Sequence, residues 1–304
     1  MPYQPATPVA FLHEWLNGER TANGRYAHHL LREEVARRPA AITPLQSAIE
    51  HANEDVRTRL RLVQLISLDP FGDEEAEVVD PARGYPAFLD YITLKGYFGE
   101  IMAGLIALTY GSHGLDSWEI PVFLFRCHEA ALQYLERQQQ EHPADEPDFA
   151  VIDEQPRIPG RTGDDCLAFQ RDANGQIVRV LCCEAKCTDG HSAKHIREAH
   201  IKASEPALKP VDLRLLIEAL EDYEDPAAIA WRDALLRLRL RAVLPPGYER
   251  CDLVCYIYAQ EPVRNRTWIP VDAPHGNYVA GRRLEAVEVY LPDIHDLIVA
   301  VYRR

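Results

Sequence analysis

Residues 163–187 read Gly-Asp-Asp-Cys-Leu-Ala-Phe-Gln-Arg-Asp-Ala-Asn-Gly-Gln-Ile-Val-Arg-Val-Leu-Cys-Cys-Glu-Ala-Lys-Cys. The stretch contains two strand-like segments joined at Asn174-Gly175, and Asn-Gly between such segments is the strongest short signal for a β-hairpin. With a two-residue turn, counting back along both strands places Asp165 directly opposite Glu184. The hairpin therefore fixes which charged side chains share a face.

Three ionisable side chains converge on one face of this predicted hairpin. Opposed residues of an antiparallel pair have Cβ atoms about 4.5–5.5 Å apart, and Lys186 joins Asp165 and Glu184 two residues along its strand. Two carboxylates that close repel each other unless a cation lies between them, and oxygen ligands of this kind suit Mg²⁺ or Mn²⁺. Asp165 and Glu184 are therefore candidate metal ligands, and Lys186 is a candidate to orient or deprotonate an attacking water. A three-residue turn would shift the register by one and make Asp164 the alternative ligand.

The segment 94–110 is apolar almost all round, as expected of a helix buried against a sheet. Glu100 is an unusual charged residue within it. Either Glu100 assists at the metal site, as ligand and catalytic residue, or it is hydrogen-bonded to a neighbouring backbone group.

An acidic residue followed by a hairpin and Glu-x-Lys, here Asp165 with Glu184-Ala185-Lys186, resembles the PD-(D/E)xK superfamily of restriction-endonuclease-like nucleases. Many members place a glutamate on the helix before the hairpin, and Glu100 matches that position. The resemblance implies an α/β fold with an αβββαβ-type core, a central mixed sheet flanked by helices, and Mg²⁺-dependent or Mn²⁺-dependent cleavage of phosphodiester bonds, with DNA as the expected substrate. It covers roughly residues 94–204.

Within that superfamily, the Gly-Tyr-Phe-Gly-Glu helix followed by Glu-Ala-Lys is similar to bacterial nucleases of anti-phage defence. One such nuclease that the sequence resembles is the subunit that works beside a helicase in Hachiman-type systems. This finer resemblance implies a protein partner such as a helicase.

The remaining elements are expected as follows. Helical pieces broken at Asn-Gly and Pro occupy 1–50, a half-buried strand 56–68, a helix 121–140 and a loop 142–159. Further helices are expected at 192–204, 211–223, 227–241 and 293–302, with strands at 251–259 and 284–291. The organisation predicted is an N-terminal acidic accessory region of mixed α+β structure, 1–84, and a nuclease core, 85–304, with a helical insertion near 205–245.

Charge is unevenly distributed along the 304 residues, whose net charge is −14. Residues 1–160 hold 13 Lys+Arg against 25 Asp+Glu, a balance of −12, and residues 161–304 hold 20 against 22, a balance of −2. Phosphate binding depends on Lys and Arg, so the N-terminal half is poorly suited to DNA. Lys194, Arg197 and Lys202, on the helix expected after the hairpin, are the candidate nucleic-acid contacts, unless they form an ordinary solvated face.

The sequence lacks an apolar run of about 18 residues, which predicts a cytoplasmic protein without a membrane span. The seven cysteines are expected to be reduced thiols. Cys251 and Cys255, with Cys127, Cys166, Cys182, Cys183 or Cys187, could supply a zinc or iron–sulfur site, but the chain has no Cys-x-x-Cys pair.

Two less specific interpretations stand beside the nuclease. Asp165, Glu184 and Lys186 could form a cross-strand salt-bridge cluster on a solvated face, with little effect on stability. The chain could also be a non-catalytic subunit that keeps the nuclease fold to bind nucleic acid or a protein partner, which would explain its acidity more simply.

Overall fold

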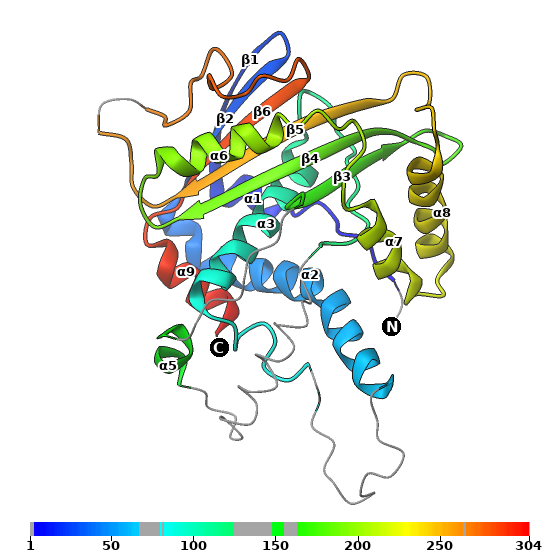
Figure 1. The fold of residues 1–304 in the computed structure, drawn as a ribbon. Coiled ribbons are helices and arrows are strands. Elements are labelled where there is room, and N and C mark those ends of the chain that lie inside the picture. Colours follow the sequence, from blue (N-terminus) through cyan, green and yellow to red (C-terminus); the bar gives the residue numbers. More distant parts are fainter. Residues whose placement is uncertain are drawn as a thin grey trace, which may run out of the picture.

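The computed structural model describes residues 3–66, 80, 82–124, 148–154, 163–263 and 266–303 (Figure 1). These residues form an α/β fold with a six-stranded mixed sheet of order β1-β2-β6-β5-β4-β3. The strands are β1 Leu16–Asn23, β2 Tyr26–Glu33, β3 Cys166–Arg171, β4 Ile177–Thr188, β5 Glu249–Tyr258 and β6 Arg283–Tyr290. The coarse fold class predicted from the sequence is thus confirmed.

β3 and β4 form the predicted hairpin, with Cys166 opposite Cys183. The two-residue turn is wrong: Asp172 N–H donates to the Gln176 carbonyl, which leaves a three-residue loop closed by Gly175 at φ +71°. A register shift between Gln170 and Arg171 then compensates for the extra loop residue. The predicted register is therefore restored along the rest of the hairpin.

Four strands run parallel in the middle of the sheet. β4 pairs with β5, β5 with β6 and β6 with β2, all in parallel, while β1 and β3 lie antiparallel at the two edges. Parallel neighbours need crossover connections, and parallel sheets are covered by helices on both faces. The long apolar strands β4 and β5 therefore belong to the buried middle of the sheet, where Leu181, Cys182, Cys183 and Ala185 are all buried.

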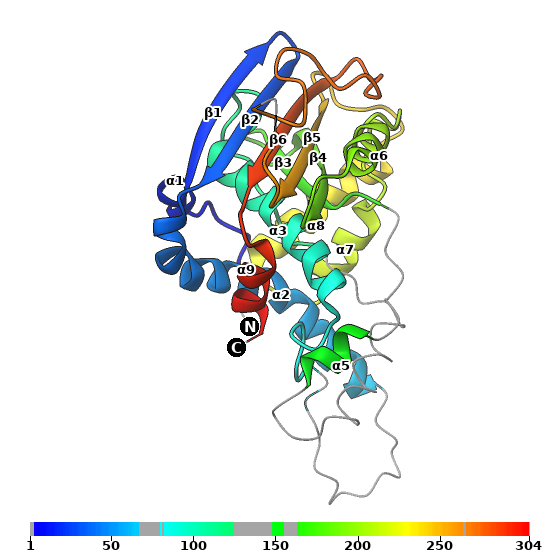
Figure 2. The same ribbon diagram turned by 90° about the vertical axis from the view of Figure 1, so that its left-hand side faces the viewer.

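Helices cover both faces of this sheet (Figures 1 and 2). Leu181, Cys183 and Ala185 of β4 face a hydrophobic core shared with α1, α2, α3 and α9, whereas Val180 and Cys182 face the core under α7 and α8. α6 packs over β5 on this second face. The helices are α1 Phe11–Trp15, α2 Arg38–Ile66, α3 Tyr91–Tyr110 and α9 Ile294–Tyr302 on the first face, and α6 Ala193–Ala203, α7 Leu213–Glu221 and α8 Pro226–Leu240 on the second.

Local sequence explains where several helices begin. The Asp90 carboxylate accepts hydrogen bonds from the backbone N–H groups of Ile92 and Thr93 at the start of α3. The hydroxyl of Ser192 caps α6 through the N–H of His195, and α8 begins with Pro226 after the capping residue Asp225. These side chains satisfy donors that the first helical turn leaves unpaired. The predictions for helices 94–110, 192–204, 211–223, 227–241 and 293–302 and for the strands β5 and β6 are confirmed within a few residues at each end.

The N-terminal predictions need correction. Residues 16–33 form a hairpin with Asn23 opposite Tyr26, so the expected helices are wrong there. The strand expected at 56–68 is also wrong, because α2 extends to Ile66. Its buried side chains, Leu45, Ile49, Ala52, Val56 and Leu60, recur every three or four residues. That spacing is helical, and the alternation seen from Val56 onward is only a local coincidence.

The sheet continues across the boundary predicted at residue 84. β2 pairs with β6, and Leu12 and Trp15 belong to the same core as α3 and β4. The short helices η1 Val35–Arg37 and α5 Phe149–Glu154 complete the elements described here. The loop expected at 142–159 is wrong where α5 forms, and most of the helix expected at 121–140 lies outside the described residues.

α3 is the central helix of the first face. Of the described helices, it alone is long and apolar enough to span a membrane by length and composition, and 61% of its most apolar window is buried inside the structure. A core helix meets the same criteria. Gly99 and Gly104 let α3 approach the hairpin, because a Cβ at Gly99 would lie 3.2 Å from Cys187 Cβ and one at Gly104 would overlap Phe123.

Candidate active site

Asp165 and Glu184 lie together at the start of β3 on the second face of the sheet. The Asp165 N–H donates to the Cys183 carbonyl at 3.1 Å, so the backbone pairing departs by one residue from the predicted Asp165–Glu184 opposition just before β3 begins. The carboxylate Oδ2 of Asp165 accepts a hydrogen bond from the Ala185 N–H at 2.8 Å. The hairpin thus holds the Asp165 side chain beside Glu184, as the sequence predicted.

Two lysines neutralise this carboxylate pair. Lys186 Nζ lies 2.6 Å from Glu184 Oε1. Lys202, from α6, lies 3.2 Å from Asp165 Oδ1 and also contacts Glu184 Oε2. The ammonium of Lys202 therefore occupies the point on which the two carboxylates converge.

Burial changes the acidity of these groups. Glu184 is 3% exposed. The pKa of Glu184 is raised to about 7, chiefly by burial and next by the Asp165 charge, while Lys186 and Lys202 act in the opposite direction. Burial alone would lower the pKa of Lys202, but Asp165 and Glu184 together raise it above the ordinary lysine value. Glu184 is consequently a carboxyl group that can gain or lose a proton near neutral pH.

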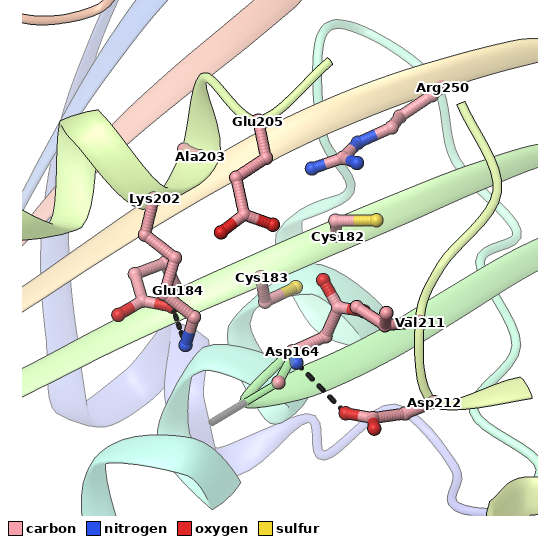
Figure 3. A pocket seen from close by; sticks show the side chains of 11 residues that line it. Asp164, Cys182, Cys183, Glu184, Lys202, Ala203, Glu205, Val211, Asp212 and Arg250 are labelled. Carbon is pink, nitrogen blue, oxygen red and sulfur yellow. Dashed lines mark hydrogen bonds and ion pairs between the residues drawn. The ribbon is translucent and has the colours of Figure 1, made fainter. Parts of the chain in front are cut away.

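A hollow of about 280 Å³ adjoins the cluster (Figure 3). Its walls carry the carboxyl groups of Asp164, Glu184, Glu205 and Asp212 together with two cationic groups; the full lining is Gly163, Asp164, Cys182, Cys183, Glu184, Lys202, Ala203, Glu205, Val211, Asp212 and Arg250. Four carboxyl groups outnumber two cations, so the chemistry of this hollow favours positively charged guests.

Asp164 lies in the hollow rather than between the hairpin strands. Its backbone N–H donates to Asp212 Oδ2 at 2.9 Å. Gly163, at φ +145°, permits this approach, because a Cβ there would lie 2.3 Å from the same oxygen. Burial raises the pKa of Asp164, the charge of Arg250 lowers it and that of Asp212 raises it, with a net rise. The carboxylate that shares the Lys202 ammonium with Glu184 is therefore that of Asp165, not that of Asp164.

Glu100 is carried by α3, on the other face of the sheet. Gly99 packs against Ala185 and Cys187, whose side chains point away from Glu184. The charge of Glu100 contributes to the raised pKa of Tyr302 in α9. The metal-assisting role of Glu100 stays a prediction.

The basic residues of α6 divide into two groups. Lys194 is exposed and pairs with Glu198 at 3.7 Å, four residues along the helix. Arg197 is also exposed. Lys202, which the sequence suggested as a third nucleic-acid contact, instead faces the carboxylates. The helical spacing contains this information, because Lys202 follows the buried Ala199 by three residues and so lies toward the sheet.

Sequence reasoning missed a second buried cluster beside the hollow. Asp252 of β5 accepts hydrogen bonds from Arg250 Nε at 2.9 Å, Arg282 Nε at 2.9 Å and the Tyr278 hydroxyl at 2.8 Å. A charged residue in the otherwise apolar strand Cys-Asp-Leu-Val-Cys was the available signal.

The cysteines form part of the core. The six that the structure describes are free thiols, five of them buried. Burial raises the pKa of Cys182, Cys251 and Cys255, which favours the neutral thiol over the thiolate that binds metals. Cys127 lies outside the described residues.

The number and type of available ligand atoms decide whether the site could hold a divalent ion. Among the residues that the structure describes, no group of three or more His, Cys, Asp and Glu is arranged to hold a metal. Mg²⁺ commonly keeps several waters and takes only one or two protein carboxylates. Asp165 and Glu184 provide two, which matches the number and kind of protein ligands that a hydrated divalent ion takes. In this structure the Lys202 ammonium lies between them, so such an ion would have to displace it.

Comparison with known proteins adds no relative. No protein-family model matches the chain, and a search of the curated proteins finds no match.

Proposed function

We propose that this protein is a metal-dependent nuclease that hydrolyses phosphodiester bonds of DNA. The observation that carries the proposal is the convergence of Asp165, Glu184 and Lys186 on one face of the hairpin, with Glu184 almost fully buried. A solvated salt-bridge cluster would not need a buried carboxyl group whose pKa is raised to about 7.

The order of elements supports a PD-(D/E)xK-type core. The described elements run from α3 through an isolated bridge between Glu119 and Phe169, on the outer side of β3, to α5, β3, β4, α6, α7, α8 and β5. If α5, α7 and α8 are taken as insertions, the remaining helix, three extended segments, helix and strand follow the αβββαβ order that the resemblance implies. β5 also lies parallel to the strand that carries Glu184 and Lys186.

Each residue of the cluster has a distinct role in this proposal. Asp165 and Glu184 would hold Mg²⁺ or Mn²⁺, which when bound polarises the phosphodiester and lowers the pKa of a water. Lys186, held beside Glu184, would orient the attacking water or neutralise charge on the phosphate. Glu100 would assist only if α3 brings its carboxylate to the metal. Lys194 and Arg197 would contact phosphates from the exposed side of α6.

The cellular setting follows from the same resemblance. The acidic N-terminal half suits contact with a protein partner, such as a helicase, better than contact with DNA. We propose a role in prokaryotic anti-phage defence and a cytoplasmic location. The alternative function, a non-catalytic subunit that binds nucleic acid or a protein, is favoured by the Lys202 ammonium, because a lysine can replace the metal permanently.

The test is cleavage of linear, supercoiled and single-stranded DNA by the purified protein in Mg²⁺ or Mn²⁺. Glu184→Gln and Lys186→Met should each lower the cleavage rate by about 100-fold or more, since each removes a charge at the reacting phosphate. Arg37→Met, which removes an exposed positive charge outside the site, is the control and should retain cleavage.

Two results would count against the nuclease. Cleavage that persists in Glu184→Gln at the wild-type rate would indicate a contaminating enzyme. Binding of DNA without cleavage on any substrate, and without stabilisation by either metal, would favour the non-catalytic subunit.

A further inference from the structure

Lys202 competes for the position that a metal ion requires. Its ammonium contacts Asp165 Oδ1 and Glu184 Oε2 from α6, while Lys186 contacts the other oxygen of Glu184. A divalent ion placed between the carboxylates would lie beside this ammonium, and like charges at such a distance repel strongly in a partly buried site. Lys202 must therefore move before the ion can bind.

The adjoining hollow provides a place for the displaced ammonium. Lys202 lines this hollow together with Asp164, Glu205 and Asp212 (Figure 3). Asp164 Oδ2 is buried and has no hydrogen-bond partner within the described part of the chain. A buried carboxylate oxygen without a donor costs free energy, and an incoming ammonium would supply that donor.

We propose that the site works by cation exchange: metal entering between Asp165 and Glu184 drives the Lys202 ammonium into the hollow, where it pairs with Asp164. Lys202 is then a positioning residue that pairs with both carboxylates when no metal is bound. Asp164 pairs with the displaced ammonium and so stabilises the metal-bound arrangement without contacting the ion. This inference rests on the proposed metal site, but not on DNA cleavage.

The experiment measures Mn²⁺ binding by isothermal titration calorimetry, at fixed pH and without nucleic acid. Lys202→Met removes the competing charge and should tighten Mn²⁺ binding about tenfold. Asp164→Asn removes the receiving carboxylate and should weaken binding about fivefold. Arg37→Met, which removes an exposed positive charge outside the site, should leave the affinity unchanged.

The double variant separates an indirect role from direct ligation. In the Lys202→Met background there is no ammonium to receive, so Asp164→Asn should change the Mn²⁺ affinity by twofold or less. An equal weakening by Asp164→Asn in both backgrounds would show that Asp164 is itself a ligand and would overturn the exchange. Unchanged or weaker binding in Lys202→Met would overturn it as well, as would the absence of Mn²⁺ binding in all variants.

Folding and function are controlled separately. Circular dichroism and thermal unfolding in chelator identify variants that fail to fold, and Lys202→Gln provides a second removal of the charge, with the same expected tightening. If the variants show the predicted coupling but no DNA is cleaved, the nuclease proposal fails while the cation exchange stands.

Discussion

Two buried carboxylates on the same face of the sheet, those of Asp252 and Glu184, have contrasting surroundings. Asp252 pairs with Cys182 and Glu184 pairs with Val254 across β4 and β5, so the two acids are two register positions apart. Asp252 is fully buried, and donors from Arg250, Arg282 and Tyr278 reach both of its oxygens. Glu184 shares Lys202 with Asp165 and borders the hollow.

The difference lies in how completely each charge is satisfied. Arg250 also donates to the Ala207 carbonyl, and Arg282 to the carbonyls of Ala203 and Glu205, so the Asp252 cluster ties three chain segments together. Beside Glu184, by contrast, a carboxylate oxygen of Asp164 has no donor among the residues that the structure describes. Complete networks rigidify a fold, whereas incomplete ones with displaced pKa values mark places where something binds.

The largest expected effect is on the complete cluster. Asp252→Asn should lower the free energy of unfolding by about 3–5 kcal/mol, because it leaves the buried guanidinium group of Arg250 and the partly buried one of Arg282 without their counter-charge. Urea denaturation followed by circular dichroism measures this change. Asp165→Asn, the same chemical change in the incomplete cluster, should cost about 1 kcal/mol or less, since its side chain is partly solvated. Equal decreases in the free energy of unfolding for the two variants would show that the two clusters contribute equally to stability.

A smaller effect is expected from pH in the incomplete cluster. The pKa of Glu184 is about 7 in the folded protein and about 4.5 when unfolded, so the folded state binds more protons between these values. Its contribution to stability is present below pH 4.5 and is lost as pH rises through 7. In metal-free protein, wild type should lose about 2 kcal/mol relative to Glu184→Gln between pH 5 and pH 8. Parallel stability profiles for the two proteins would show that Glu184 does not titrate in this range.

The smallest effect concerns the exposed side of α6. Lys194→Ala and Arg197→Ala should change the free energy of unfolding by less than about 0.5 kcal/mol each, because neither is buried. If they contact DNA phosphates, each should reduce the slope of log K against log salt by about one. Fluorescence anisotropy at several salt concentrations gives that slope, and a slope unaltered in the double variant would place DNA elsewhere.

Local sequence determined the hairpin, several helix starts and the residues of the candidate site. The Asn174-Gly175 turn signal, the capping residues Asp90, Ser192 and Asp225, and the Glu-x-Lys spacing depend on neighbours within a few residues. Such signals can be interpreted without knowing the rest of the chain. Asn23-Gly24 carried the same hairpin signal as Asn174-Gly175 and was missed, because the flanking strands looked helical in isolation.

Tertiary structure decided the features that depend on distant partners. β2 is a strand because it pairs with β6, some 260 residues away, and α2 is a helix because its apolar stripe packs against α9. The bulge at Val178 in β4 preserved the register, although the turn differs from the prediction. Lys202 contacts the carboxylates because α6 packs across β4. Tertiary packing determines where α6 lies on the sheet, and the helical periodicity of α6 alone does not specify it.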